Sequence, residues 1–470
     1  MCNNYNKSSI TGNTNHTIKP YTFTTEQEQK WKSTKTIGII GLGDMGLLYA
    51  TKLSENGWDV VCCDKADLYP VILEKYGDNN AYKFKILKDG HLVSRVSDYI
   101  IYSVEAEHID KIVKEYGPST KLNSIVGGQT SCKNQEISSF EKYLPLDIDI
   151  ISLHSLHGPK VDTRGQPLVM INHRVSNKEH SQFVRCIIDC FESRIVYLTA
   201  LEHDKITADT QAVTHAAFLS MGVAWYKRQT YPWCNQDSKW CGGLENAKIN
   251  ISLRIYMNKW HVYAGLAITN PAAHQQILQY ATSATELFTL MIENKREKLI
   301  DRIMKAREFV FGNQNTNGSK RLLLDDSLLI EFNLNKNKDT STSCANSMPN
   351  THLSLLAIVD SWYQLNIIPY DHMICSTPLF RIFLGVSEYL FHDKSSLLEI
   401  LDASLNTYSF RGDDLEFVIA ARNWSQIVSH GDFELYRKTF EETQKFFEPM
   451  FPEANRIGNE MIKTILNNNN

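Results

Sequence analysis

The sequence predicts an α/β chain in which an N-terminal domain built on a parallel sheet precedes an all-helical C-terminal region. Three observations support this prediction. Short apolar runs alternate with helical stretches from residue 36 to about 200, as in a parallel sheet covered by helices. A Gly-x-Gly-x-x-Gly turn follows the first of these runs. Beyond about residue 202, long amphipathic segments replace the strand candidates.

Short runs rich in β-branched and aromatic residues are the expected strands of the sheet. They are Thr36–Gly41, Asp59–Cys63, Tyr99–Ser103, Ser124–Gly127, Asp149–Leu153, Leu168–Asn172 and Arg194–Tyr197. These runs place the sheet domain in residues 31–200.

The glycine turn lies within the stretch TIGIIGLGDMGLLYA, residues 36–50. Gly41 permits a tight turn, Gly43 lets backbone N–H groups approach a pyrophosphate, and Gly46 brings the following helix against the strand. The second expected strand is followed by Asp64, where an acidic side chain meets the ribose hydroxyls of a dinucleotide. The domain is therefore predicted to be Rossmann-like and to bind a dinucleotide.

The residues expected to bind this cofactor lie on the turn and at the ends of the neighbouring strands. They are Gly41, Leu42, Gly43, Asp44, Met45, Gly46, Asp64, Lys65 and Ser103. Asp64 favours NAD because its charge repels a 2′-phosphate, whereas Lys65 offers a cation that a 2′-phosphate needs. These residues leave both NADP and NAD open.

The helical region divides at polar, low-complexity stretches. Residues 201–320 are expected to form a helical substrate or dimerisation domain, and its long amphipathic segments are Ile206–Lys227 and His274–Phe311. Residues 321–350 are interpreted as a linker or loop, and residues 351–470 as a second helical block. At the other end, residues 1–30 are predicted to be a disordered lead-in, since their start is rich in Asn, Thr and Ser.

The second helical block echoes the first. Residues 214–226 read THAAFLSMGVAWY and residues 351–363 read THLSLLAIVDSWY, with Thr-His, a Leu and Trp-Tyr at identical offsets. Residues 252–263 are echoed in the same way by residues 378–389. We interpret this as a degenerate duplication of a helical dimerisation domain, the alternative being chance likeness between amphipathic helices. The chain is accordingly expected to be a homodimer or a pseudo-symmetric monomer.

Composition excludes several classes of partner. The net charge of −4, with Lys and Arg scattered, gives no basic stripe for nucleic acid or an anionic membrane. The ten cysteines show no CxxC pair, so neither a disulfide framework nor a zinc site is expected, and we predict no metal. No apolar stretch approaches the ~20 residues of a membrane span, and no signal peptide is recognised. We expect a cytoplasmic protein.

Three further stretches gather residues suited to catalysis. GGQTSCK (127–133) and SLHSLHGPK (152–160) each include the end of an expected strand, and EHDKITADTQAVTH (202–215) opens the helical region. Ligands of open α/β sheets bind beyond the carboxyl ends of the strands. We therefore expect Ser131 and His154 in loops at that edge, facing a substrate.

These stretches, with HDKITADTQAVTHAAFLSMG, KWHVYAGLAITNP and HMICSTPLFRIFLGVSEYLF, resemble the prephenate dehydrogenase family of tyrosine biosynthesis over roughly residues 28–465, in its NADP-dependent yeast form. Against the family's motifs, His154 matches the substrate histidine, Ser131 the hydrogen-bonding serine and Arg254 the carboxylate-binding arginine. His215, Gln211 and Tyr263 fall at further substrate-binding positions. Gln211 and Tyr263 depart from the family's usual residues, and Lys160 stands where an acidic residue is common.

The resemblance implies oxidative decarboxylation of prephenate to 4-hydroxyphenylpyruvate, with hydride transfer to NADP. A neutral imidazole is the natural acceptor for the substrate's hydroxyl proton near pH 7, and we assign that role to His154, with Ser131 beside it. Arg254 would bind a substrate carboxylate because a guanidinium is a planar, bidentate and permanently charged partner.

Three alternatives stay open. An arogenate dehydrogenase would act on the amino-acid analogue of prephenate, against which the positive Lys160 argues. A β-hydroxyacid-type dehydrogenase shares the glycine signature but carries a catalytic lysine where this chain has His215. A nucleotide-sensing interaction protein would bind the dinucleotide without catalysis, so that replacing His154 would leave its function intact.

Overall fold

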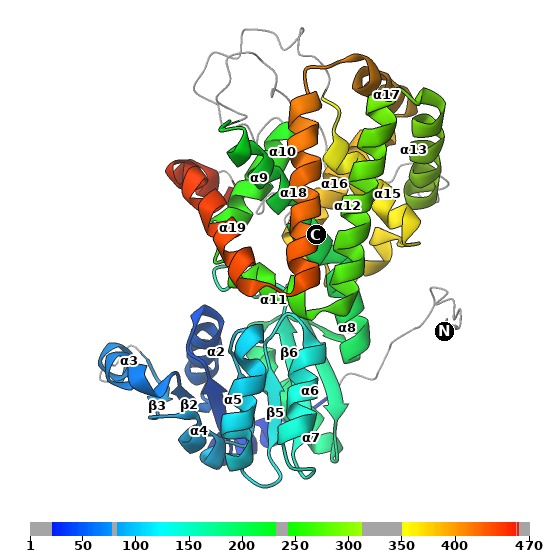
Figure 1. Ribbon diagram of the computed structural model, residues 1–470. Coiled ribbons are helices and arrows are strands. Elements are labelled where there is room, and N and C mark those ends of the chain that lie inside the picture. The colour runs from blue at the N-terminus through cyan, green and yellow to red at the C-terminus, as the bar shows by residue number, and fades with distance from the viewer. Residues whose placement is uncertain (1–20, 78–81, 232–242, 313–349, 457, 460–470) are drawn as a thin grey trace, which may run out of the picture.

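The computed structural model of the chain describes residues 21–77, 82–231, 243–312, 350–456 and 458–459. Figure 1 shows a sheet domain in the lower half and a helical region in the upper half, joined by α8 and α11. The strands are β1 (Thr36–Ile40), β2 (Asp59–Cys63), β3 (Lys85–Ile86), β4 (Tyr99–Tyr102), β5 (Ile125–Gly128), β6 (Asp149–Ser155), β7 (Pro167–Arg174) and β8 (Arg194–Tyr197). Every strand expected from the sequence is present, and the two-residue β3 is too short for a pattern to reveal.

The strands form one sheet in the order β3-β2-β1-β4-β5-β6-β7-β8. The chain order reverses between β1 and β4, which is the switch point where such sheets bind ligands. The predicted Rossmann-like domain is thereby confirmed. The prediction of an entirely parallel sheet is wrong at one place, since β7 runs antiparallel to β6. A loop of residues 156–166 joins these two strands without a crossover helix, and an antiparallel neighbour needs no more than that.

Helices cover both faces of the sheet (Figure 1). They are α1 (Thr25–Thr34), α2 (Asp44–Glu55), α3 (Tyr69–Tyr76), α4 (Gly90–Val96), α5 (Ile109–Tyr116), α6 (Lys133–Tyr143) and α7 (Lys178–Ile187), with short 3-10 turns η1 (Ala66–Leu68), η2 (Ala106–His108), η3 (Gly117–Ser119) and η4 (Ile188–Phe191). The predicted lead-in of residues 1–30 is too long. A capping box of Thr24 and Gln27 fixes the start of α1, and Trp31 on this helix is buried against the sheet domain.

The helical region begins at α8, directly after β8. Its elements are α8 (Ala200–Thr207), the π-helix η5 (Ala208–Ala212), α9 (Val213–Lys227), α10 (Gly243–Tyr256), α11 (His261–Thr269), α12 (Pro271–Ile292), α13 (Arg296–Phe311), α15 (Leu353–Gln364), η9 (Pro369–Cys375), α16 (Pro378–His392), α17 (Lys394–Asn406), α18 (Arg411–His430), α19 (Phe433–Phe447) and η10 (Glu448–Met450). The segment 206–227 expected as one helix therefore contains a π-helical turn, and the segment 274–311 breaks at Asn294, whose φ is +53°.

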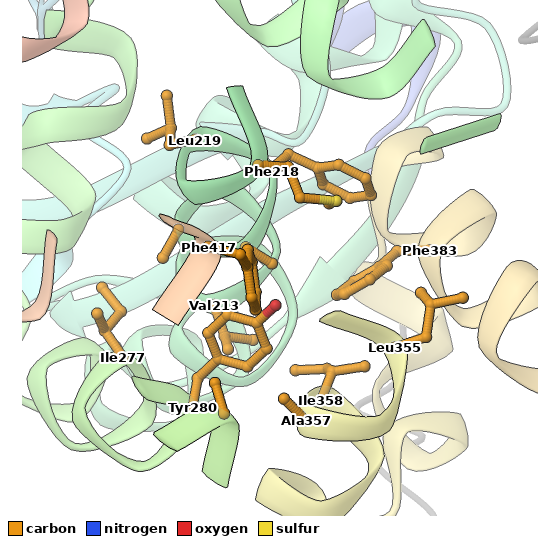
Figure 2. Close-up of a cluster of buried hydrophobic side chains, with 14 of the residues drawn as sticks. Val213, Phe218, Leu219, Ile277, Tyr280, Leu355, Ala357, Ile358, Phe383 and Phe417 are labelled. Atoms are coloured by element: carbon orange, nitrogen blue, oxygen red, sulfur yellow. The ribbon is translucent and has the colours of Figure 1, made fainter. Parts of the chain in front are cut away.

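The two helical blocks share one apolar core. Figure 2 shows Phe218 of α9 and Tyr280 of α12 beside Ile358 of α15, Phe383 of α16 and Phe417 of α18. The phenyl rings of Phe218 and Phe383 meet edge to face, with centroids 4.8 Å apart. Because helices of both blocks bury the same side chains, neither block has a core of its own.

The packing of the helices repeats between the blocks. The long helix α12 packs against α15 just as α18 packs against α9, and α12 and α18 pack against each other. The helix pair α12 and α13 is matched by α18 and α19, and α10 contacts its counterpart α16. This pairing relates α9–α13 to α15–α19 in chain order.

Parts of several predictions lie outside the described residues, namely the lead-in over residues 1–20, nearly all of the linker expected at 321–350, and the C-terminal residues 460–470. In the described part of the chain, none of the helices has the length and apolar character needed to cross a membrane.

Candidate active site

The glycine turn joins β1 to α2 at the switch point of the sheet. Gly41 has a φ of +100°, a left-handed conformation that favours glycine. A Cβ on Gly46 would come nearer to the Gly41 carbonyl than the 3.0 Å that real Cβ atoms keep, whereas one on Gly43 would meet nothing within 4 Å. No side chain caps α2, so its first N–H groups face this open space. The turn therefore fits a pyrophosphate.

Asp64 follows β2 and braces the same turn. One carboxylate oxygen accepts a hydrogen bond from the backbone N–H of Leu42 at 2.6 Å, and the other accepts one from the N–H of Lys65 at 2.8 Å. These bonds stabilise the carboxylate on the turn, while the Lys65 side chain is exposed beside it. In the first turn of α2, Met45 is half-buried and the exposed Asp44 lies 3.4 Å from the ammonium of Lys259, which precedes α11.

Ser103 and Gln129 lie at the carboxyl ends of β4 and β5. The Ser103 backbone N–H donates to the carbonyl of Ile40, and its hydroxyl donates to Gln129 Oε1 at 2.8 Å. Gln129 Nε2 is buried without a hydrogen-bond partner. An orphaned amide donor next to the glycine turn is a feature that a bound cofactor would satisfy.

His154 lies in β6, not in the loop that the sequence predicted. The strand extends two residues beyond the expected Leu153 because its pairing with β7 continues to Ser155. His154 is 7% exposed, and its Nδ1 lies 2.7 Å from His203 Nε2 on α8. The imidazole is therefore held at the carboxyl edge of the sheet by a residue of the helical region.

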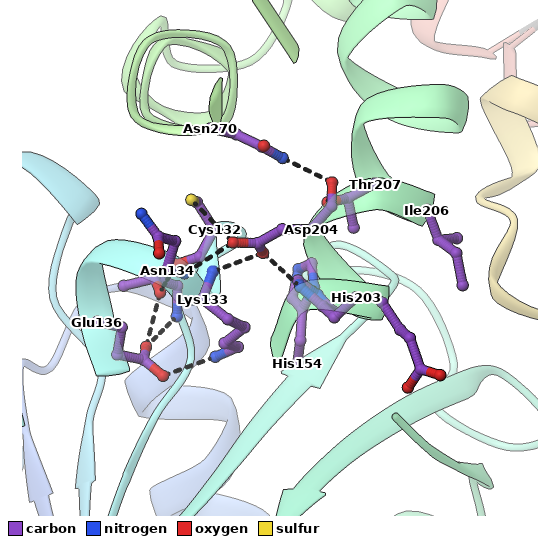
Figure 3. Close-up of polar contacts among 12 residues, drawn as sticks. Cys132, Lys133, Asn134, Glu136, His154, His203, Asp204, Ile206, Thr207 and Asn270 are labelled. Carbon is purple, nitrogen blue, oxygen red and sulfur yellow. Dashed lines mark hydrogen bonds and ion pairs between the residues drawn. The ribbon is translucent and has the colours of Figure 1, made fainter. Parts of the chain in front are cut away.

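Asp204 fastens α8 to the sheet domain, as Figure 3 shows. Its Oδ1 lies 2.8 Å from His203 Nδ1 and accepts a hydrogen bond of 2.7 Å from the backbone N–H of Lys133. Its Oδ2 accepts one of 2.7 Å from the N–H of Asn134. The carboxylate thus caps the N-terminus of α6 from another element, where the helix dipole favours negative charge.

The Lys133 side chain is completely buried beneath this cap. Its ammonium donates to Glu136 Oε1 at 2.9 Å and to the carbonyl of Leu153 at 2.7 Å. Glu136 in turn accepts hydrogen bonds from Thr130 and Ser152. The buried pair anchors the loop between β5 and α6 to the strand that carries His154.

Burial and nearby charges decide the protonation of this cluster. Burial, helped by the charges of His203 and Lys133, holds the pKa of His154 well below 6.5, so the ring is neutral at pH 7. Burial likewise lowers the pKa of His203 against the opposing effect of Asp204. Burial alone would raise the pKa of Asp204, but hydrogen bonds from His203, Lys133 and Asn134 lower it overall.

Ser131 lies in the bend between β5 and α6 and is half-buried. Within the described residues its hydroxyl makes no hydrogen bond. It therefore has a hydroxyl to offer at the edge where His154 lies, but the structure brings the two side chains into no direct contact.

Arg254, Tyr263 and His215 form a second group. Asn258 Nδ2 donates to the Tyr263 hydroxyl at 2.7 Å and to the Arg254 carbonyl at 3.1 Å, and the rings of His215 and Tyr263 meet edge to face at 4.6 Å. Arg254 is half-buried and donates to Asn459 Oδ1 at 2.9 Å. Burial lowers the pKa of this guanidinium, and no carboxylate of the described residues pairs with it.

A narrow cavity lies beside this second group. It is lined by Ala212, His215, Ala216, Leu219, Tyr263, Ala267, Ile277, Trp424, Val428 and Tyr436. His215 Nδ1 and the nearby Gln211 Nε2 are buried without partners, and burial lowers the pKa of His215 to about 3. Both atoms are polar groups that a substrate would satisfy.

The helix α11 connects the two groups. Tyr263 is near its start, while at its far end the Thr269 carbonyl accepts from Cys132 Sγ at 3.5 Å and Asn270 donates to the Asp204 carbonyl at 2.8 Å. The seven residues from Tyr263 to Asn270 correspond to roughly 10 Å along the helix. No hydrogen bond or ion pair of the described residues joins His154 directly to Arg254. The groups flank α11 instead.

The sequence predictions missed several residues of this site: Gln129, Lys133, His203, Asp204 and Asn258. One signal was available for two of them. Thr199 and Glu202 form a capping box, which fixes the first turn of α8 and so points the next two residues, His203 and Asp204, toward the sheet edge.

Comparisons with known proteins agree with this picture. Residues 212–467 match a family model described as a 6-phosphogluconate dehydrogenase C-terminal domain. The chain is 64% identical over 438 residues to prephenate dehydrogenase [NADP(+)] of Saccharomyces cerevisiae, covering 93% of this chain and 95% of that one. It is 55% identical to a probable prephenate dehydrogenase [NADP(+)] of Schizosaccharomyces pombe, covering 93% and 99%.

Among solved structures, the chain is similar to prephenate dehydrogenase from A. aeolicus in complex with hydroxyphenyl propionate and NAD+. The identity is 17%, the TM-score is 0.46, and the likeness covers 57% of this chain and 94% of that one.

Proposed function

Because this chain belongs to the prephenate dehydrogenase family, we propose that it converts prephenate and NADP+ to 4-hydroxyphenylpyruvate, CO2 and NADPH, a step of tyrosine biosynthesis. One observation of the structure supports this above the others. A neutral histidine, His154, is held at the carboxyl edge of a dinucleotide-binding sheet with its Nδ1 engaged and its Nε2 free of hydrogen bonds from the described residues.

NADP+ would lie along the switch point of the sheet. The N-terminus of α2 and the space beside Gly43 would hold the pyrophosphate, and Gln129 would meet the cofactor further along the edge. When bound, the cofactor accepts the hydride that the substrate gives up. The charge of Asp64 is stabilised by two backbone N–H groups, which reduces its repulsion of a 2′-phosphate, and the exposed Lys65 can approach that group.

His154 would act as the general base. As the hydride leaves, the hydroxyl proton of the same ring carbon passes to Nε2. Loss of the ring carboxylate as CO2 leaves its electron pair in the ring, which becomes aromatic. The proton then returns from His154 to the phenolate oxygen, so the reaction releases no net proton. Ser131 would hydrogen-bond the reacting hydroxyl.

Arg254 would bind a carboxylate of the substrate. A guanidinium that is half-buried without a carboxylate partner is costly in the empty protein, and a substrate carboxylate would relieve that cost. His215, Gln211 and Tyr263 would line the binding site on the same side, and the narrow cavity there would widen by movement of these side chains.

The second helical block would complete the site within one chain. Trp424 and Val428 of α18 and Tyr436 of α19 line the cavity opposite His215 and Tyr263. The repeated packing of α9–α13 and α15–α19 supports a degenerate duplication, in which the second block replaces a partner subunit. We propose a pseudo-symmetric monomer, with a homodimer as the alternative. Sedimentation should give the monomer mass of 53.8 kDa, and a tight dimer would contradict the proposal.

A steady-state assay tests the activity and the cofactor together. Purified protein is incubated with prephenate or arogenate, each with NADP+ or NAD+, and the absorbance of reduced nicotinamide is followed while 4-hydroxyphenylpyruvate is identified by mass spectrometry. Prephenate with NADP+ should give the highest kcat/KM. Preference for arogenate would indicate the amino-acid substrate instead, and binding of NADP+ without turnover would indicate a nucleotide sensor. A cytoplasmic location stays a prediction.

A further inference from the structure

The residues His154, His203 and Asp204 form a continuous hydrogen-bonded chain from the sheet edge to the N-terminus of α6 (Figure 3). We propose that His203 and Asp204 are positioning residues that fix the tautomer of His154, so that its lone pair is on Nε2, facing the substrate. This inference rests on the proposed role of His154 as the base.

Asp204 sets the direction of the chain. Its two oxygens already face two backbone N–H donors at 2.7 Å, and those donors cannot be reversed. An ionised carboxylate only accepts hydrogen bonds, so the His203 nitrogen that lies 2.8 Å away, Nδ1, must carry the proton. Because burial disfavours a charged ring, His203 Nε2 then has only its lone pair.

His154 is the next member of the chain. Since His203 Nε2 is an acceptor, the contact of 2.7 Å requires a proton on His154 Nδ1. A neutral imidazole carries one N–H, so His154 Nε2 is left with a lone pair. The charged and titratable groups around the two rings are Lys133, Glu136, Asp204 and His157. The buried ammonium of Lys133 opposes protonation of both rings, which keeps this tautomer neutral.

The replacement Asp204→Asn tests the direction of the chain. Its amide can donate to His203 Nδ1, which moves the His203 proton to Nε2 and forces the His154 proton onto Nε2. The base is then blocked. We expect kcat to fall by about 10²–10⁴-fold, with the Kd for NADP+ unchanged. A kcat within a few fold of wild type would overturn the proposal.

Nitrogen-15 NMR of histidine-labelled protein reads the tautomer without turnover. The His154 signals are identified by their loss in His154→Asn. In wild type, His154 Nε2 should show the shift of an unprotonated ring nitrogen and Nδ1 that of an N–H; in Asp204→Asn the two should exchange. A protonated Nε2 in wild type would overturn the inference even if prephenate is turned over. An unprotonated Nε2 in a protein inactive on prephenate would overturn only the proposed function.

A second pair of variants separates positioning from structural support. His203→Gln keeps an oxygen that can accept from His154 Nδ1–H, whereas His203→Leu keeps bulk but no acceptor. The glutamine variant should retain at least tenfold more of kcat than the leucine variant; equal kcat values would overturn the proposal. Glu141→Gln, which alters the surface pair of Glu141 and His173 at 3.0 Å, is the control and should leave kcat and the His154 signals unchanged.

Discussion

Replacing Gly46 by alanine should weaken NADP+ binding and destabilise the fold, because the new methyl group has no room. Its Cβ would approach the Gly41 carbonyl closer than 3.0 Å and lie 3.2 Å from Ser103 Oγ. The neighbour is backbone, so the glycine turn must move. Overpacking of this kind costs about 1–3 kcal/mol of unfolding free energy. Displacing one N–H from a phosphate costs about 1.5–3 kcal/mol more in binding, or roughly 10–150-fold in Kd.

Gly43→Ala is the matched comparison. Its φ of −67° and ψ of −174° suit alanine, and its Cβ would meet no protein atom within 4 Å. Stability should therefore be unchanged or rise by up to about 1 kcal/mol. Binding should still weaken, because the methyl group would occupy the space assigned to the pyrophosphate. Calorimetric titration with NADP+ and thermal unfolding measure the two effects. Wild-type affinity in both variants would refute this placement of the cofactor.

Three further predictions concern the reaction. His154→Asn should lower kcat by about 10²–10⁴-fold without changing the Kd for NADP+; a parallel loss of affinity would contradict the assigned role. Arg254→Gln should raise the KM for prephenate by about 10–150-fold with kcat nearly unchanged, since the residue binds ground state and transition state alike; an unchanged KM would place the carboxylate elsewhere. Because the pKa of His154 lies well below 6.5, kcat/KM should stay level between pH 8 and 6.5 and fall only at lower pH, so an acidic limb centred near 6.5 or above would show a solvated ring.

The sheet domain was largely predictable because each strand is a short apolar run and the glycine turn has a fixed spacing. The direction of β7 was not, since periodicity within a strand carries no information on whether its neighbour is parallel. The same limit explains why His154 was expected in a loop. The pairing of β6 with β7 extends the strand to Ser155, and a partner strand is a tertiary feature.

The site was predictable only one residue at a time. His154 and Arg254 carry recognisable chemistry, but their partners do not stand near them in the sequence. His203 is 49 residues from His154, and Asp204 is 71 residues from Lys133. The shared core of the two helical blocks was also hidden, because amphipathic periodicity shows that a helix face is buried but not which helix covers it.

A crystal structure with NADP+ and 4-hydroxyphenylpyruvate tests the central claim most directly. Our account places the phenolic oxygen within about 2.6–3.2 Å of His154 Nε2, next to the nicotinamide ring, with the product's carboxylate on Arg254. A phenolic oxygen bound away from His154, with Nε2 turned toward protein atoms, would contradict it.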